Sequence, residues 1–160
     1  MEKGFYIFNE QLNPENPFHD FSFLGQIETD YFMNALDFLH GYCVTFAYII
    51  SKNLGYPIVI RRLSEPECDG EGDVIHAWCE TDRKYIDVRG ITENFGKFWE
   101  EFEDFDSFDL EDDDYETFRF QNAKDFYKFL DGNQNPETFG MNRLKAAQEL
   151  FDVYKDYYIA

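Results

Sequence analysis

The longest apolar pattern of the chain lies in "CVTFAYIISKNLGYP", where apolar side chains recur on nearly every side of a helix. The pattern predicts a helix over residues 42–53, because Gly55 and Pro57 directly after it are a typical helix stop. A helix that is apolar all round is buried on more than one face. We therefore expect this helix to lie at the centre of the fold.

Segments rich in β-branched and aromatic residues predict strands around this helix. A first strand is predicted at residues 4–8, followed by a loop at residues 10–27. After the central helix come three predicted strands, "PIVIRRL", "VIHAWCE" and "KYIDVRG", of which the last two are joined by the short turn "TDR". A short helix at residues 28–39, with Thr29 or Asp30 as its cap, is predicted to precede the central one.

The C-terminal half combines acidic and aromatic residues. Residues 93–116 contain twelve acidic residues and one lysine, and their aromatic residues at spacings of three and four predict an amphipathic helix with an acidic outer face. Residues 109–116 are a predicted acidic loop, residues 121–130 another helix, and Asn135-Pro136 the start of the last helix. Because no internal repeat or linker is visible, we expect one α+β domain over residues 1–160.

The composition excludes several classes of protein. With 44% hydrophobic and 20% aromatic residues, a chain of 160 residues can bury a core without disulfides. A net charge of −19 repels nucleic acid and anionic membranes, and it suits a basic protein or peptide as partner. No apolar run follows Met1-Glu2-Lys3, so no signal peptide is predicted, and no stretch is long enough to span a bilayer. Three cysteines without a CxxC spacing predict reduced thiols and a cytoplasmic location.

Cys43 lies where the central helix begins, directly after Gly41-Tyr42. The unpaired N–H groups and the positive dipole end at a helix N-terminus favour a thiolate, which is the nucleophilic form of cysteine. The same N–H groups can hold the oxyanion that forms when an acyl group is attacked. The placement indicates a candidate nucleophile, and the alternative is a cysteine that is simply part of the core.

A nucleophilic cysteine needs a base, and His76 on the strand "VIHAWCE" is the candidate. If the hairpin closes with a two-residue loop at Asp82-Arg83, His76 and Asp87 become diagonal neighbours on one face, within side-chain reach. A four-residue loop would keep the same register, whereas a three-residue loop would place Asp87 on the other face. An even-numbered loop therefore favours His76 as general base with Asp87 orienting its ring. The alternatives are a structural histidine and an aspartate that only ends a strand.

Three short segments in this order resemble the core of the papain-like and transglutaminase-like cysteine enzymes. They are "HGYC" opening a buried helix, "HAWCE" on a strand and "YIDVRG" on the next strand, and they are most similar to the transglutaminase-like side. The resemblance covers residues 38–91 and implies a buried Cys-bearing helix packed on an antiparallel sheet. It implies Cys43 as nucleophile, His76 as general base and acid, and Asp87 as orienting group. Residues 92–160 are then an acidic, aromatic-rich helical region outside the resemblance.

Further residues are expected around this triad. Tyr42, Trp78 and Arg89 are the candidate substrate contacts, although Trp78, which shares a face with His76, is equally a plain core residue. Gln26 is the nearest preceding glutamine that could help to hold an oxyanion, but its distance along the chain favours an ordinary loop residue.

No cofactor or metal is expected. The loop around Cys68 lacks the ligand spacing of a zinc site, and the acidic cluster Asp109–Asp114 lacks the glycine and the alternation of a calcium loop.

Two functions of different classes follow from these patterns. The first is a thiol-dependent hydrolase or acyltransferase that acts on a protein or peptide amide through a thioester on Cys43, as a protease, deamidase or transglutaminase-like enzyme does. The second is a non-catalytic acidic binding or inhibitor protein that uses the carboxylates of residues 93–116, for example as a mimic of nucleic acid. The ordered Cys43, His76 and Asp87 favour the first.

Overall fold

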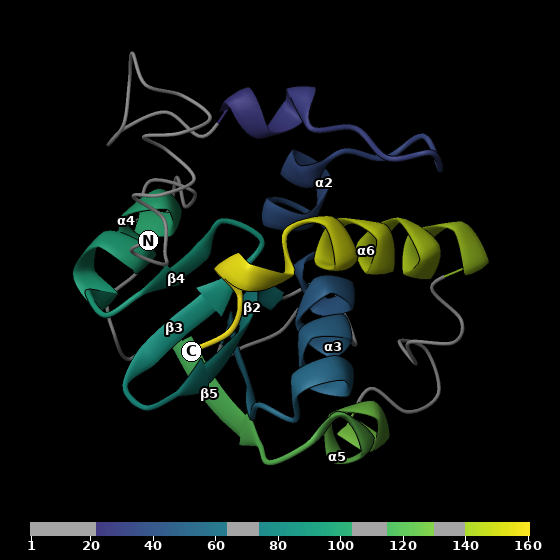
Figure 1. The fold of residues 1–160 in the computed structure, drawn as a ribbon. Helices are drawn as coiled ribbons and strands as arrows, with labels where there is room; N and C mark the ends of the chain where they lie inside the picture. The colour runs from purple at the N-terminus through teal and green to yellow at the C-terminus, as the bar shows by residue number, and fades with distance from the viewer. Residues whose placement is uncertain (1–21, 64–73, 104–114, 130–139) are drawn as a thin grey trace.

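The computed structural model describes residues 22–63, 74–103, 115–129 and 140–160. Within these ranges an antiparallel five-stranded sheet of order β4-β3-β2-β1-β5 is combined with helices (Figure 1). This arrangement confirms the predicted α+β class, while the strand predicted at residues 4–8 lies outside the described residues. The elements are η1 (Ser22–Gln26), α2 (Ala35–Leu39), α3 (Cys43–Leu54), β1 (Ile58–Leu63), β2 (Val74–Thr81), β3 (Lys84–Asp87), β4 (Gly90–Thr92), α4 (Phe95–Glu103), β5 (Tyr115–Phe120), α5 (Ala123–Phe129), α6 (Met141–Val153) and η5 (Lys155–Tyr157).

The central helix forms as predicted. Helix α3 begins at Cys43 after the N-cap Tyr42 and ends at Leu54, before the C-cap Gly55, whose φ of 76° is the left-handed conformation that glycine adopts readily. The side chains buried along it point in every direction around the axis, which confirms that the helix is enclosed on more than one side. These buried residues are Cys43, Val44, Thr45, Phe46, Ala47, Ile49, Ile50 and Ser51.

The short helix before it begins later than predicted. Helix α2 starts at Ala35 because Asn34 and Asp37 form a capping box, with each side chain accepting a hydrogen bond from the other residue's backbone N–H. The hydroxyl of Thr29 donates instead to the carbonyl of Met33 in a preceding turn, at 2.7 Å. The prediction that Thr29 or Asp30 caps this helix is therefore wrong.

The hairpin between β2 and β3 has the register that the site prediction requires. Thr81 pairs with Lys84, so the loop consists of Asp82 and Arg83 alone. These two residues have φ values of 51° and 60°, as in the type I′ turn whose twist suits a two-residue hairpin. The even register follows from this turn, and it places positions 76 and 87 on one face of the sheet.

The third predicted strand is in fact two strands. Strand β3 ends at Asp87, and the chain turns through Val88 and Arg89 before Gly90 pairs back with Asp87 to begin β4. The turn is closed by the Asp87 carboxylate, which accepts a hydrogen bond from the backbone N–H of Arg89 at 2.9 Å. The prediction of one strand through "KYIDVRG" missed this side-chain interaction with the backbone.

The described part of the C-terminal half includes a strand that the sequence did not predict. Residues 115–120 form β5, which pairs antiparallel with β1 along the edge of the sheet. In this segment Phe118 and Phe120 alternate with Arg119, a strand pattern that the neighbouring carboxylates obscured. Residues 109–114 of the predicted acidic loop lie outside the described residues, whereas residues 115 and 116 belong to this strand.

The last two helices differ in how well their starts were predicted. Helix α5 lies within the predicted range 121–130. Helix α6 begins at Met141. Its N-cap Gly140 has a φ of 97°, which lies outside the α-helical region, so the helix does not extend through this residue toward the N-terminus. The predicted start at Asn135-Pro136 is therefore wrong for this helix, and those two residues lie outside the described ranges.

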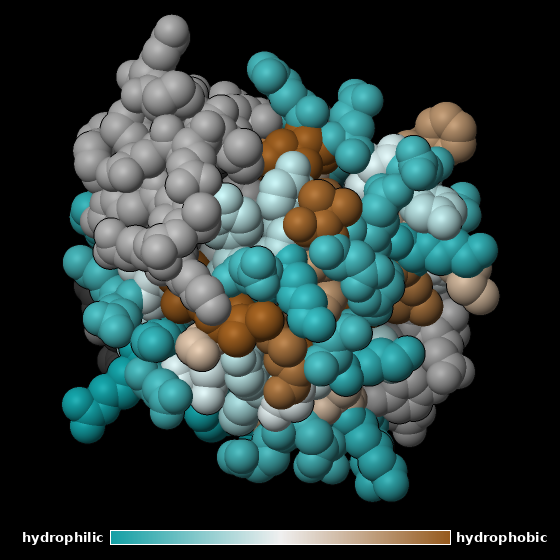
Figure 2. Space-filling view, viewed as in Figure 1, coloured by the Kyte–Doolittle hydropathy of each residue, from teal (hydrophilic) through white to brown (hydrophobic). Residues whose placement is uncertain are grey.

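Helices cover both faces of the sheet (Figure 1). On one face the thiol of Cys79 donates to the carbonyl of Ala47, in the middle of α3, at 3.4 Å. On the opposite face the rings of α4 pack against His76 and Trp78. No helix in the described part of the chain is long and apolar enough to cross a membrane. Figure 2 shows hydrophilic groups over most of the described surface in this view, with apolar groups gathered between them.

Candidate active site

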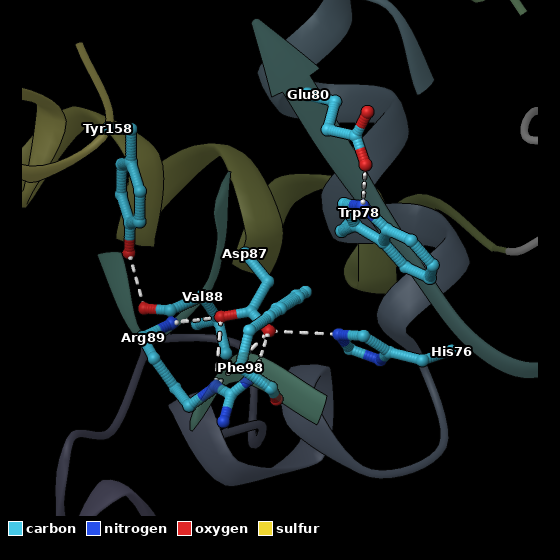
Figure 3. Close-up of polar contacts among 8 residues, drawn as sticks. All are labelled: His76, Trp78, Glu80, Asp87, Val88, Arg89, Phe98 and Tyr158. Atoms are coloured by element: carbon cyan, nitrogen blue, oxygen red, sulfur yellow. Dashed lines mark hydrogen bonds and ion pairs between the residues drawn. The ribbon is translucent and has the colours of Figure 1, made fainter. Parts of the chain in front are cut away.

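His76 and Asp87 meet on the face of the sheet that α4 covers. His76 comes from β2 and Asp87 is the last residue of β3, and Nε2 of His76 lies 2.8 Å from Oδ2 of Asp87 (Figure 3). Both side chains are buried, with exposed fractions of 0% and 3%. The diagonal contact that the two-residue turn predicted is therefore present.

Arg89 holds the carboxylate of Asp87 from the other side (Figure 3). Its Nη2 lies 2.8 Å from Oδ2, and its Nε lies 3.1 Å from Oδ1. Nη2 also donates to the carbonyl of Phe98 in α4 at 3.1 Å. Arg89 is fully buried, so Asp87 and Arg89 form an ion pair inside the protein, with the backbone of α4 as a further partner.

The ion pair determines which nitrogen of His76 can act as a base. Burial by itself raises the pKa of Asp87, but the charge of Arg89 and the hydrogen bonds from His76 and Arg89 outweigh it and hold the pKa below its ordinary value. An ionised carboxylate only accepts hydrogen bonds, so Nε2 of His76 carries the proton that it donates to Asp87. In a neutral ring the lone pair is then on Nδ1.

His76 is neutral at neutral pH. Burial lowers its pKa, and the hydrogen bond and charge of Asp87 act in the opposite direction without cancelling the effect. Its ring is stacked 4.1 Å from the ring of Phe102 and lies 5.6 Å from Phe98 and 5.9 Å from Trp78, centroid to centroid. Nδ1 is buried and has no hydrogen-bond partner within the described residues. Leaving such an atom unpaired costs about 1–3 kcal/mol, which a purely structural histidine would avoid.

Cys43 is the first residue of α3 and is 5% exposed. The N-cap Tyr42 makes no side-chain hydrogen bond to the helix, so no side chain of that residue competes for the first N–H groups. The structure does not join the thiol to the base by a hydrogen bond, since Nδ1 of His76 has no partner in the described ranges. His40, three residues before Cys43, lies 6.1 Å from the ring of Phe102, which in turn stacks on His76. His40 and the base therefore approach the same side chain of α4, whereas α3 packs on the opposite face of the sheet, beside Cys79.

The three candidate substrate contacts have different surroundings. Tyr42 is half-buried, and the guanidinium of Arg143 lies 3.9 Å from its ring centroid. Trp78 is 1% exposed and donates through Nε1 to Glu80 at 3.1 Å (Figure 3). Arg89 faces Asp87 rather than solvent. A fully buried guanidinium suits the anchoring of Asp87 better than a contact with substrate.

The remaining cysteine and glutamine candidates do not join this group. Gln26 is exposed at the end of η1. Cys79 points to the opposite face of the sheet, and burial raises the pKa of its thiol far above the ordinary value. Cys68 lies outside the described residues.

Two residues of the site were missed or misread from the sequence. The spacing of Arg89 two residues after Asp87, at the end of a strand, was a usable signal for a side chain that returns to the carboxylate. Tyr158 had no such signal, because it lies 70 residues from its partner: its hydroxyl donates to the carbonyl of Val88 at 2.9 Å. Its ring contacts Phe46 of α3, so it joins the helix that bears Cys43 to the turn after Asp87.

Comparison with protein-family models, curated proteins and solved structures gives no match to the chain. The chemistry of the site is therefore argued from its own geometry. Within the described residues no group of three or more histidine, cysteine, aspartate or glutamate side chains is placed to hold a metal ion. The acidic residues 104–114, on which the alternative binding function depends, lie outside the described ranges.

The shifted pKa values of His76 and Asp87 predict that the protein loses stability as pH falls. The pKa of His76 is lower in the folded than in the unfolded state, so as pH falls below about 6.5 the unfolded state binds a proton that the folded state does not, and the free energy of unfolding falls by up to about 1.4 kcal/mol per pH unit. The pKa of Asp87 is also lowered, so a second loss begins near pH 4, where the unfolded carboxyl protonates.

Urea unfolding at stepwise pH measures both losses. We expect His76→Gln, whose amide can still donate to Asp87, to flatten the profile just below pH 6.5, and Asp87→Asn to flatten it below pH 4. Equal slopes in the wild type and in His76→Gln would contradict the neutral, buried state of this histidine.

Proposed function

We propose that this protein is a thiol-dependent hydrolase or acyltransferase that acts on a protein or peptide amide through a thioester on Cys43. The observation that carries the proposal is the chain of contacts from Arg89 through Asp87 to His76, which keeps a lone pair on the buried Nδ1. A base whose tautomer is set by a carboxylate is the arrangement that activates a thiol or hydroxyl nucleophile. The order Cys43, His76, Asp87 and the resemblance of residues 38–91 to transglutaminase-like and papain-like enzymes support the same assignment.

The residues have distinct parts in the reaction. Nδ1 of His76 takes the thiol proton of Cys43, and the thiolate attacks the carbonyl carbon of the amide. The oxyanion that forms lies at the N-terminus of α3, where the backbone N–H of Cys43 and the helix dipole stabilise it. The protonated His76 then gives its proton to the leaving amine, and a thioester remains on Cys43. Water or a second amine attacks the thioester, with His76 again as base, to release an acid or a new amide.

The reaction requires the thiol and the base to come within hydrogen-bond reach. Such contacts are often loose in a free enzyme and tighten when substrate binds. The ring of Phe102 stacks on His76, so α4 covers one side of the base, and the proposed reaction requires substrate to reach Nδ1 from another side. The net charge of −19 favours a basic protein or peptide at long range.

The rate of iodoacetamide labelling at each cysteine, followed against pH by peptide mass spectrometry, tests the proposal. We expect Cys43 to label with an apparent pKa below the ordinary thiol value of about 8.5, and His76→Gln to slow this labelling at pH 7 by roughly tenfold. Cys79 is the internal control, because it is buried and its pKa is raised. If Cys43 labels only after unfolding, the thiol is a core residue. If Cys43 labels equally fast in the wild type and in His76→Gln, His76 does not activate it. Either result means that the proposal is wrong.

A further inference from the structure

Phe32 is an exposed aromatic side chain on a strained stretch of backbone. Its exposed fraction is 99%, whereas its two neighbours, Tyr31 and Met33, are partly buried and pack against the hydrophobic core. Its φ of 62° lies in the left-handed region, which a bulky residue adopts rarely and at a cost. Folding gains neither burial nor a relaxed backbone from this side chain, and strained residues of this kind cluster at ligand-binding sites. Phe32 is therefore a candidate for contact with another molecule.

The loop that carries Phe32 is held by its own hydrogen bonds. An antiparallel bridge between Glu28 and Asn34 closes it. Inside the loop, the N–H and the hydroxyl of Thr29 both donate to the carbonyl of Met33, at 2.9 and 2.7 Å. The exposure of Phe32 is thus a property of a defined loop. A partner meets the ring already in place, without the entropic cost of ordering it.

The loop lies alongside helix α6 and brings two carboxyl groups together next to Phe32 (Figure 1). The backbone N–H of Asp30 donates to Oε2 of Glu149 in α6 at 3.0 Å. Partial burial and the carboxyl group of Asp30 raise the pKa of Glu149, against the effect of this hydrogen bond. Within the described residues no ion pair neutralises either carboxylate, and Lys145 of α6 lies over the ring of Tyr31 at 5.9 Å. The surface next to Phe32 therefore carries excess negative charge.

An aromatic face beside carboxylates fits the side chain of arginine. The planar guanidinium stacks on an aromatic ring, and its N–H groups, along the edge of the stack, pair with carboxylates. A second copy of this chain would bring a further net charge of −19 and is repelled. The charge of this surface therefore selects a basic partner, and the ring selects a cation that can stack.

We propose that the loop at residues 28–34 is a docking point for an arginine side chain of a basic protein or peptide. The guanidinium lies on the ring of Phe32, and its N–H groups point toward Asp30 and Glu149. The docking point stands on its own geometry and does not require Cys43. That the arginine belongs to the substrate rests on the function proposed above.

Helix α6 connects this docking point to the candidate active site. Glu149 follows Arg143 by six residues, which is about 9 Å along a helix. The guanidinium of Arg143 lies 3.9 Å from the ring centroid of Tyr42, the N-cap of α3. A peptide that is docked at the loop can therefore extend along α6 toward the start of α3, where Cys43 lies.

Binding of two matched peptides tests the proposal. The experiment follows the ¹H–¹⁵N NMR signals of the Cys43→Ala protein, in which no reaction occurs, at constant ionic strength. The probes are acetyl-Gly-Arg-Arg-Gly-amide and the same peptide with citrulline, a planar uncharged analogue, in place of both arginines. We expect the arginine peptide to shift the signals of residues 28–34 and 145–149 until they saturate. Its Kd should be at least about fivefold lower than that of the citrulline peptide.

Two variants separate docking from general attraction to an acidic protein. Phe32→Leu keeps an apolar side chain at the same strained position but lacks the ring, and Glu149→Gln keeps an acceptor for the N–H of Asp30 but lacks the charge. Each should weaken the binding of the arginine peptide by about threefold or more. The matched controls are Met141→Ala, at another exposed apolar residue, and Asp156→Asn, at another exposed carboxylate. Both controls should bind as tightly as the parent protein.

Three results overturn the proposal. The first is a set of shifts that spreads over the acidic surface without saturation at residues 28–34. The second is unchanged binding of the arginine peptide in Phe32→Leu. The third is a dimer of the parent protein that Phe32→Leu abolishes in sedimentation velocity, because a second copy would then cover the ring.

The outcome is separate from that of the labelling experiment. A thiol that proves inert together with localised binding of the arginine peptide removes the catalytic function and leaves the docking point. An activated thiol together with no localised binding leaves the enzyme and removes the docking point.

Discussion

Replacing Arg89 by methionine will lower the free energy of unfolding by about 3–5 kcal/mol, the largest loss that we expect from a change of one polar residue. The guanidinium is fully buried and makes two of the closest contacts to the carboxylate of Asp87. Methionine fills much of the same volume but leaves Asp87 charged in the interior with only His76 and a backbone N–H as donors. The pKa of Asp87 then rises, because burial is no longer outweighed.

Urea unfolding at pH 7 measures this loss, and a double variant identifies its cause. When Asp87→Asn is added to Arg89→Met, no buried charge remains, so the double variant should be more stable than Arg89→Met alone. The matched control is Arg119→Met, which breaks a partly exposed ion pair with Glu80, with 45% and 25% of the side chains exposed. Such pairs contribute about 1 kcal/mol or less. A loss in Arg89→Met no greater than that in Arg119→Met would show that the buried pair does not hold this part of the fold.

Replacing Asp87 by asparagine will slow the acylation of Cys43 by p-nitrophenyl acetate by roughly 10²–10⁴-fold. Arg89 only donates hydrogen bonds, so it will orient the oxygen of the new amide side chain toward itself and turn the NH₂ group toward His76. His76 must then accept at Nε2 and carry its proton on Nδ1, where it can no longer take the proton of the thiol. The loss therefore comes from the tautomer, and it needs no change in the fold.

The acylation of Cys43 is measured as a burst of p-nitrophenol release and by mass spectrometry of the acetylated peptide. Cys43→Ala should show no acetyl group at position 43, while Cys79→Ala, which changes a thiol on the opposite face of the sheet, should retain the wild-type burst. Acylation of Asp87→Asn at the wild-type rate would mean that His76 is not the base.

Local patterns were enough to predict the parts of the site that lie within one element or one turn. The apolar periodicity and the Gly55 stop defined α3, and so placed Cys43 at a helix start. The shortness of the turn at Asp82-Arg83 set the hairpin register, and the alternation of side chains along the two strands then brought His76 to Asp87. Each of these steps depends on neighbours fewer than about twelve positions apart.

Where prediction failed, a side chain competed with the local pattern. The capping box of Asn34 and Asp37 delayed the start of α2, and the carboxylate of Asp87 ended a strand that its apolar neighbours would continue. In β5 the surrounding negative charge obscured a short alternating segment that is a strand because β1 offers it a partner.

By itself, the sequence determined the α+β class, the central helix and the order of Cys43, His76 and Asp87, since helix and strand periodicity and turn chemistry act over short distances. Only the tertiary structure decided that Arg89 is buried against Asp87, that Phe102 of α4 covers His76, and that Tyr158 joins α3 to the turn after Asp87. These contacts arise when α4 packs onto the sheet, and when α6 and the C-terminal Tyr158 pack against α3. The free energy of an ion pair, a ring stack or a buried hydroxyl depends on the surroundings that this packing creates. The periodicity of the sequence therefore does not predict these contacts.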